Sequence, residues 1–328
     1  MNPAATLLGR TVPPEPAGVR PCVLCGSPVE LVLAGVTDTR FGVPGLYSIH
    51  RCNGCGLEQT RPASSLAQLK ELYEKHYNFG GERNTSYTSL RERFLFSPLY
   101  KLWLLLDGDI SFHRPRGSGR LLDIGCNEGR GLKLYARNGF HAEGLELNDN
   151  AARIAREFGF TVHSELLEEF RPLAPYDVAI LSNVLEHTVD PRAMLVHVQR
   201  ILRSGGQVWI SCPNSESWLR RTMGRYWINW HVPFHTVHFS PGALCGLLEE
   251  VGFHDVRIGF ATPALWVASS VITRLFARPG KATRQLRNPL LVMLFVAVVR
   301  LLLFPVFYVE NRRRKGDCLV VTARKSWL

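Results

Sequence analysis

The feature that most constrains the fold is residues 119–159, "GRLLDIGCNEGRGLKLYARNGFHAEGLELNDNAARIAREFG". An apolar run at 120–124 leads into a glycine-bearing turn, and a helical pattern begins near Gly129. A second strand pattern at 142–147 and a second helical pattern follow. This order predicts a βαβ unit, in which ligands bind at the carboxyl ends of the strands. At 328 residues the chain is long enough for one substantial α/β domain with additions.

The turn after the first strand does not match a dinucleotide-binding loop. A G-x-G-x-x-G fingerprint starting at Gly125 would need glycine where the chain has Asn127 and Arg130. The stretch instead resembles the first motif of class I S-adenosylmethionine-dependent methyltransferases, an acidic residue followed by G-x-G-x-G. Here the motif stands as Asp123, Gly125, Asn127 and Gly129, with asparagine in place of the middle glycine. Because asparagine tolerates a left-handed backbone better than most residues, we expect the turn to be retained.

The resemblance implies further cofactor-binding residues. Glu146 ends the second strand, where the family commonly has an acidic residue and where a carboxylate can accept hydrogen bonds from both ribose hydroxyls. The alternative is a surface glutamate at a strand end. Glu165 is the candidate for contact with the adenine, and Ser164 is nearly as good. Leu147 and Asn183 complete the predicted cofactor-binding set.

The later strands extend the resemblance. The stretch "YDVAILSNVLEHTVDP" at 176–191 contains the EH-x-x-DP segment common in the ubiquinone-biosynthesis-like branch of these enzymes. The resemblance covers residues 118–260, and the final strand "DCLVVTARK" also fits. It implies an α/β fold with a seven-stranded Rossmann-like sheet whose last strand is antiparallel. We therefore predict a methyltransferase domain at 118–328.

Four cysteines near the N-terminus predict a metal site. The segments "CVLCG" and "RCNGCG" each place two thiolates on a tight turn, and 26 residues separate the two pairs. The predicted ligands are Cys22, Cys25, Cys52 and Cys55. Four thiolates suit a structural zinc ion and leave no position for water, so we expect a zinc ribbon within residues 1–60. A redox-active disulfide pair is the alternative.

A helical connector is predicted at 61–117, between the cysteine-rich segment and the methyltransferase domain. It includes an aromatic and leucine-rich stripe formed by Phe94, Leu95, Tyr100 and Trp103. This stripe could line a substrate pocket, although such stripes more often serve plain packing.

Methyl transfer requires a positioned acceptor and removal of its proton, and a neutral histidine suits the second task. His235 lies in a segment where related methyltransferases carry a proline, a histidine and an "HFSP"-like motif, and His187 follows the fourth strand. We take His235 and His187 as the candidate catalytic bases. The alternative is that both histidines only bond the backbone, and His238 is expected to be structural.

The apolar and basic segment at 264–315 is unusual for a soluble enzyme. The net charge is +11, and +10 of it lies from residue 264 onward. A helix spanning a membrane here would place Arg300 at its middle, at a cost of about 2.5–3.5 kcal/mol. We therefore predict a helical hairpin in one leaflet, with its arginines reaching headgroups and the basic cluster 312–315 binding anionic lipid. A hairpin buried in a dimer interface is the alternative, and nucleic acid is the weaker partner.

Together these features predict a methyltransferase that acts on a hydroxyl of a glycan, lipid-linked or small-molecule acceptor at a membrane surface. The N-terminus lacks the apolar core of a secretory signal, so we expect a cytoplasmic protein associated peripherally with the inner face of the membrane. A C-methyltransferase of a nucleotide sugar is one alternative. A catalytically inactive cofactor- or lipid-binding module is another.

Overall fold

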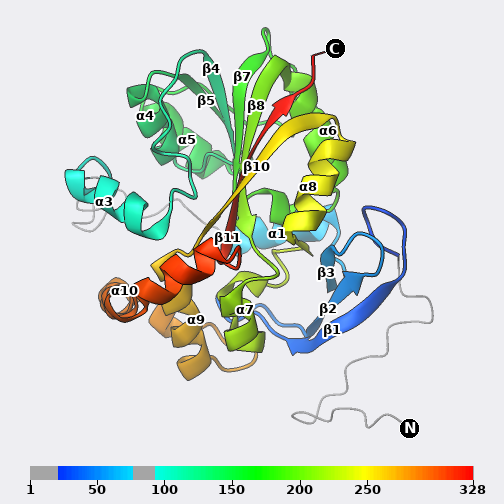
Figure 1. The fold of residues 1–328 in the computed structure, drawn as a ribbon, viewed down its shortest axis with the longest axis vertical. Coiled ribbons are helices and arrows are strands. Elements are labelled where there is room, and N and C mark those ends of the chain that lie inside the picture. Colours follow the sequence, from blue (N-terminus) through cyan, green and yellow to red (C-terminus); the bar gives the residue numbers. More distant parts are fainter. Residues whose placement is uncertain (1–20, 77–92, 328) are drawn as a thin grey trace.

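The structure is a computed structural model that describes residues 21–76 and 93–327. The predicted N-terminal tail at 1–20 lies outside the described residues. The main element is a seven-stranded sheet with the strand order β10-β11-β8-β7-β4-β5-β6 (Figure 1). Its strands are β4 (Arg120–Ile124), β5 (His141–Leu145), β6 (Val162–His163), β7 (Tyr176–Ser182), β8 (Leu202–Pro213), β10 (Phe253–Ala261) and β11 (Cys318–Lys325).

The direction of the strands confirms the predicted fold class. β4 pairs in parallel with β5 and β7, and β7 pairs in parallel with β8. The last strand, β11, lies between β8 and β10 and is antiparallel to both. This is the Rossmann-like methyltransferase sheet that the sequence predicted.

Helices cover both faces of this sheet. Figure 1 shows α4 (Arg130–Arg137) and α5 (Asp149–Glu157) on one face, and α6 (Pro191–Ile201) and α8 (Pro241–Glu250) on the other. Because successive side chains of a strand point to opposite faces, Leu121 of β4 packs in the core on one side and Leu122 in the core on the other. Continuous apolar strands such as β4 and β7 are typical of a sheet buried on both faces.

A second, four-stranded sheet contains the cysteine-rich segment. It consists of β1 (Val29–Val36), β2 (Tyr47–Cys52), β3 (Glu58–Arg61) and β9 (Val237–His238), in that order. The strand β9 comes from the predicted domain at 118–328 and pairs antiparallel with β3. The N-terminal module, as we call residues 21–76, also includes helix α1 (Leu66–His76) and is thus bonded into the segment that carries His235.

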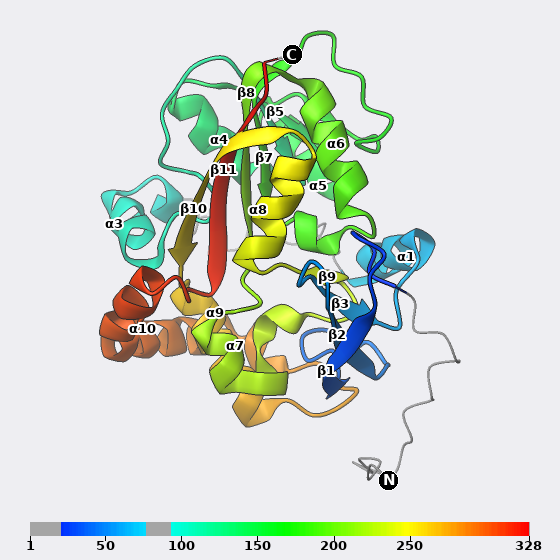
Figure 2. The same cartoon turned by 45° about the vertical axis from the view of Figure 1, so that its right-hand side comes forward.

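The predicted helical pair between the last two strands is present. Helices α9 (Ala264–Phe276) and α10 (Pro289–Arg312) pack against each other, and α10 is continuous through Pro305. Both lie below the carboxyl ends of the parallel strands, as does α7 (Trp218–Met223) (Figure 2). Among the described helices, α10 is long and apolar enough to cross a membrane by length and composition.

The prediction that Arg300 reaches lipid headgroups is wrong. Its guanidinium pairs with Asp107 of α3 (Pro98–Asp107), with 2.5 Å between Nη2 and Oδ1. It also lies 3.6 Å from the ring centroid of Trp103. A charge in the middle of an apolar helix is costly unless it is paired, and α3 supplies the partner within the protein. Trp103 also meets Phe94 edge to face at 5.6 Å, and it packs against the buried cluster that contains Val296 and Val299 of α10.

Candidate active site

The loop between β4 and α4 has the conformation that its motif predicts. Gly125, Asn127 and Gly129 all have positive φ, with values of 72°, 52° and 73°. A Cβ atom at Gly129 would lie 2.7 Å from the Cβ of Ala155 in α5, so a side chain there would displace that helix. Asn127, at the middle position of the motif, adopts the left-handed backbone that the family's glycine would have there.

Glu146 follows β5 directly, and its carboxylate points at this loop. Oε2 accepts a hydrogen bond from the backbone N–H of Asn127 at 2.9 Å, and Oε1 accepts one from Asn148 at 2.8 Å. Burial raises the pKa of Glu146, and these backbone donors oppose the shift. A carboxylate held between two backbone amides is preorganised to accept further bonds from a diol, and this geometry disfavours the alternative of an uninvolved surface glutamate.

Asp123 lies buried at the base of the same loop. Burial, followed by the neighbouring Glu146 carboxylate, raises the pKa of Asp123 to about 8. Gly131, which the sequence analysis did not single out, approaches this carboxyl closely. A Cβ atom at Gly131 would lie 3.1 Å from Asp123 Oδ2 and 3.0 Å from a ring carbon of Tyr135. The signal was available as the glycine two positions beyond the end of the motif.

The other predicted cofactor residues lie at the ends of neighbouring strands. Asn183 follows β7 with a φ of 55°, and its side-chain Oδ1 is buried without a hydrogen-bond partner among the described residues. Leu147 is 59% exposed beside Glu146, and Glu165 is exposed after β6. Ser164 accepts a hydrogen bond from Arg156 at 2.5 Å. The individual roles of these residues remain predictions.

His235 is buried in a defined tautomer. Its Nδ1 lies 2.7 Å from the carbonyl oxygen of Asn229, which can only accept, so Nδ1 carries the proton and Nε2 does not. Burial and three neighbouring histidines hold the pKa of His235 well below its ordinary value. The result is a neutral imidazole whose Nε2 can accept a proton.

His187 lies next to His235, with 4.5 Å between the ring centroids. Its Nδ1 contacts the phenol of Tyr73 at 2.5 Å and the carbonyl oxygen of Phe234 at 3.1 Å. Burial lowers the pKa of His187 to about 4. The structure thus brings the two candidate bases together, although they lie 48 positions apart in the sequence.

Glu186 is a site residue to which the sequence analysis gave no role. Its side chain is 1% exposed, and neither carboxylate oxygen has a hydrogen-bond partner among the described residues. Burial raises the pKa of Glu186 to about 8. Oε1 lies 4.0 Å from His235 Nε2, and the ligand atoms of Glu186, His187 and His235 are all within 4.8 Å of one another. In the sequence, Glu186 could have been noticed because it directly precedes His187 in the EH-x-x-DP segment. The side chains of Glu186, His187 and His235 could also hold a metal ion.

The side chains of Glu186, His187 and His235 form what we call the histidine cluster, and the N-terminal module packs against one side of it. Tyr73 of α1 contacts His187, and Phe41 packs against Phe234 with 5.3 Å between ring centroids. Thr60 of β3 donates a hydrogen bond to the carbonyl oxygen of His235 at 2.7 Å. His238 in turn lies 3.0 Å from the hydroxyl of Thr60, an arrangement that fits a structural role.

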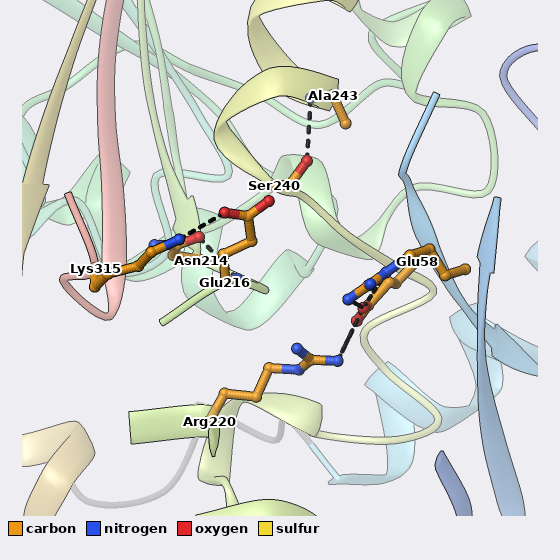
Figure 3. Close-up of polar contacts among 8 residues, drawn as sticks. Glu58, Asn214, Glu216, Arg220, Ser240, Ala243 and Lys315 are labelled. Atoms are coloured by element: carbon orange, nitrogen blue, oxygen red, sulfur yellow. Dashed lines mark hydrogen bonds and ion pairs between the residues drawn. The ribbon is translucent and has the colours of Figure 1, made fainter. Parts of the chain in front are cut away.

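An ion pair joins the module to α7 nearby. The buried carboxylate of Glu58 lies 2.8 Å from Nη2 of Arg220 (Figure 3). The same figure shows Ser240 accepting a hydrogen bond from the N–H of Ala243, which caps the N-terminus of α8. These contacts fix both ends of the segment that carries His235.

The four predicted zinc ligands converge. The sulfur atoms of Cys22 and Cys55 are 3.6 Å apart, those of Cys25 and Cys52 are 3.3 Å apart, and all four lie within 4.8 Å of one another. Backbone N–H groups of Gly54 and Cys55 point at the sulfur of Cys52. Four thiolates bound tetrahedrally to one zinc ion, each about 2.3 Å from it, would have sulfur–sulfur distances close to those in the structure. The donor set therefore fits a tetrahedral zinc ion.

Comparison with known proteins identifies the family. The methyltransferase domain family matches residues 87–258, which is more than half of the chain. The chain belongs to the class I S-adenosylmethionine-dependent methyltransferases. The relatives of this methyltransferase include the ubiquinone biosynthesis O-methyltransferase of Thiobacillus denitrificans, 26% identical over 210 residues that cover 60% of this chain and 85% of that protein. The protein with the same description from Erwinia tasmaniensis is 29% identical over 178 residues, covering 50% and 73% of the two chains.

The methyltransferase is also similar to solved structures. One is a SAM dependent methyltransferase from Archaeoglobus fulgidus, with 21% sequence identity and a TM-score of 0.44 over 74% of this chain and 100% of that one. S-adenosylmethionine is the methyl donor of the family to which the chain belongs, and the loop from Gly125 to Gly129 and Glu146 follow β4 and β5 at their carboxyl ends, where sheets of this kind bind their ligands. Glu146 is predicted to hold the ribose there, and the loop from Gly125 to Gly129 is predicted to let the backbone approach the cofactor closely.

Proposed function

We propose that this methyltransferase transfers a methyl group to a hydroxyl of a glycan, lipid-linked or small-molecule acceptor at a membrane surface. The observation on which the chemistry rests is the unprotonated Nε2 of His235, fixed by the hydrogen bond from Nδ1 to Asn229. The resemblance to ubiquinone biosynthesis O-methyltransferases supports oxygen as the atom that is methylated.

The proposed reaction uses the histidine cluster as its base. S-adenosylmethionine, when bound, supplies an electrophilic methyl group on a sulfonium. His235 Nε2 accepts the hydroxyl proton of the acceptor as the new oxygen–carbon bond forms and the carbon–sulfur bond breaks. The buried carboxyl of Glu186 lies 4.0 Å from Nε2 and, in its ionised form, favours the imidazolium that results. His187 orients the acceptor or acts as the base in its place.

We infer that the four-cysteine cluster holds a structural zinc ion. The module is small and has a limited core of its own, and its β3 bonds directly to the His235 segment. Metal binding would supply folding free energy to the module and so hold Thr60 against the carbonyl of His235. No catalytic step is assigned to this ion.

The membrane proposal rests on the exposed face of α10. Six of its apolar side chains are more than half exposed: Leu290, Met293, Leu294, Leu301, Leu302 and Tyr308. A contiguous apolar face of this kind marks an interaction site. The pair between Arg300 and Asp107 holds the middle of α10 on the protein, and both ends of 264–315 continue into strands of one sheet. We therefore propose that α10 lies in the plane of a cytoplasmic membrane face, with its basic end at anionic headgroups.

A vesicle experiment separates this surface from a dimer interface. The double variant Leu301→Asp/Leu302→Asp is expected to lose flotation with anionic vesicles, because each aspartate puts a charge on the face that enters the acyl region. Leu173→Asp is the matched control, since Leu173 is fully exposed and lies elsewhere on the surface. Loss of dimerisation in the double variant, with unchanged flotation, would instead assign the face to a second copy of the chain.

The acceptor is tested by isotope transfer. Cells lacking the protein, cells producing it and cells producing His235→Gln are grown with methyl-labelled methionine, and their lipid and glycan extracts are compared by mass spectrometry. We expect a methyl ether that only the active protein produces. Label found on carbon would favour the nucleotide-sugar alternative, and the absence of any labelled product would favour a cofactor-binding module without catalysis.

A further inference from the structure

A pocket of about 490 Å³ lies between α7 and the C-terminal end of α10, away from the histidine cluster. Its lining is Trp218, Arg221, Thr222, Glu310, Arg313 and Lys315. The two helices meet through Trp218 and Phe307, whose ring centroids are 6.2 Å apart. The pocket therefore opens where the apolar helix ends and the basic cluster begins.

The lining carries more positive than negative charge. Lys315 pairs with Glu216 at 2.9 Å, as Figure 3 shows, and Arg313 pairs with Glu310 at 3.2 Å. Arg221 is exposed and has no ion-pair partner among the described residues. Glu310 in the lining and Glu216 beside it thus neutralise two of the three cations, and the charge of Arg221 remains as an excess that an anion can satisfy.

The hydrogen-bonding capacity of the pocket points the same way. Guanidinium and ammonium groups only donate, and the indole N–H of Trp218 is a donor without a partner among the described residues. Two arginines and a lysine around one cavity suit the several oxygen atoms of a phosphate group.

The surroundings of the pocket identify the source of the phosphate. On α10, Val306, Tyr308 and Val309 are 38%, 55% and 42% exposed next to Glu310 and Arg313. A phosphate linked to acyl chains would satisfy the basic pocket and the apolar face together, whereas a free phosphate ion would satisfy only the pocket. Resting on the proposed membrane-facing function, we propose that this pocket binds the phosphate group of an anionic membrane lipid and so fixes how the enzyme sits on the membrane.

A short-chain lipid tests the pocket without a membrane. Dihexanoyl phosphatidic acid, kept below its micelle concentration, is titrated into the full chain by calorimetry at fixed ionic strength. The pocket variant Arg221→Gln/Arg313→Gln is compared with Arg284→Gln/Arg287→Gln, which removes the same charge from exposed positions ahead of α10. Each basic residue near an anionic lipid contributes about 1 kcal/mol, or about fivefold, so the pocket variant should bind about 25-fold more weakly. The control should stay within about twofold.

Two results would overturn the proposal. Equal losses in both double variants would mean that diffuse charge attracts the lipid, and no binding by the unmodified chain would mean that there is no phosphate site. Titration of inorganic phosphate distinguishes the source: an affinity equal to that of the lipid would assign the pocket to soluble phosphate.

Vesicle flotation keeps this inference separate from the proposed function. Suppose that Arg221→Gln/Arg313→Gln floats as well as the unmodified chain while Leu301→Asp/Leu302→Asp does not. This result would support the proposed membrane surface on α10 and contradict the proposed phosphate pocket. If the short-chain lipid binds in the pocket but no variant floats, the pocket stands and the proposed membrane surface falls.

Discussion

Replacing Glu58 with glutamine should destabilise the whole chain. Both oxygens of the fully buried Glu58 carboxylate contact Arg220 Nη2, at 2.8 and 3.0 Å. Its Oε1 also accepts hydrogen bonds from Arg51 at 2.7 and 3.0 Å. Burial raises the pKa of Glu58, and Arg220 and then Arg51 oppose that shift.

The expected loss follows from the exposure of the two arginines. Removing one partner of a buried ion pair costs about 3–5 kcal/mol, because the other charge is left without compensation. The Arg51 side chain is 42% exposed and can return to water, whereas that of Arg220 is 13% exposed and cannot. We therefore expect the lower part of this range, about 3 kcal/mol.

Urea unfolding followed by tryptophan fluorescence measures this loss. The matched control is Glu157→Gln, which breaks an exposed pair with Arg153 one helical turn away and should cost about 0.3–0.5 kcal/mol. In a double-mutant cycle, the double variant Glu58→Gln/Arg220→Met should lose much less unfolding free energy than the sum of the losses in the two single variants. Equal losses for Glu58→Gln and Glu157→Gln would refute the idea that this pair ties the N-terminal module to α7.

Further predictions concern protonation, catalysis and metal. Because the pKa of Asp123 is raised to about 8, the folded chain holds a proton there that the unfolded chain releases near pH 4. The unfolding free energy should thus fall as pH rises from about 4 to about 8, by up to about 1.4 kcal/mol per pH unit. The unfolding free energy, measured by denaturation across this pH window, should change less with pH in Asp123→Asn than in the unmodified chain. An equal change in both would contradict the raised pKa of Asp123. His235→Gln should lower the rate of methyl transfer by about 10²- to 10⁴-fold without changing cofactor affinity, whereas His197→Gln should leave both unchanged; normal turnover of His235→Gln would remove it as the base. Atomic emission should find one zinc ion per chain, and a strong chelator should lower the melting temperature in the unmodified chain but not in Cys25→Ser; zinc-free protein of full stability would speak against a structural metal.

The arrangement of the loop after β4 and Glu146 could be predicted because these residues are close in sequence. Asp123, the glycine-bearing turn and Glu146 belong to one βαβ unit, so strand order and local backbone preference place them together. The cysteine cluster was predictable for a similar reason, since the two pairs lie on turns joined by a hairpin of β1 and β2.

The histidine cluster was predictable only in part. The type of residue suggested His187 and His235, but their proximity depends on how α1, η1 (Leu185–His187) and the loop before β9 pack. Thr60 bonds to a residue 175 positions away, and no local pattern indicates such a contact. Likewise, the burial of Glu186 and the pairing of Arg300 with Asp107 arise from tertiary packing, which residue spacing does not encode.

The central claim is that the crevice below β4 and β5 holds S-adenosylmethionine through Glu146. Calorimetric titration of S-adenosylmethionine into the unmodified chain, Glu146→Ala and the control Glu157→Ala tests it most directly. A hydrogen bond to a charged group contributes about 1.5–3 kcal/mol, so Glu146→Ala should bind about 10- to 150-fold more weakly and Glu157→Ala within about twofold of the unmodified chain. Full affinity in Glu146→Ala, or no binding by the unmodified chain, would contradict the account.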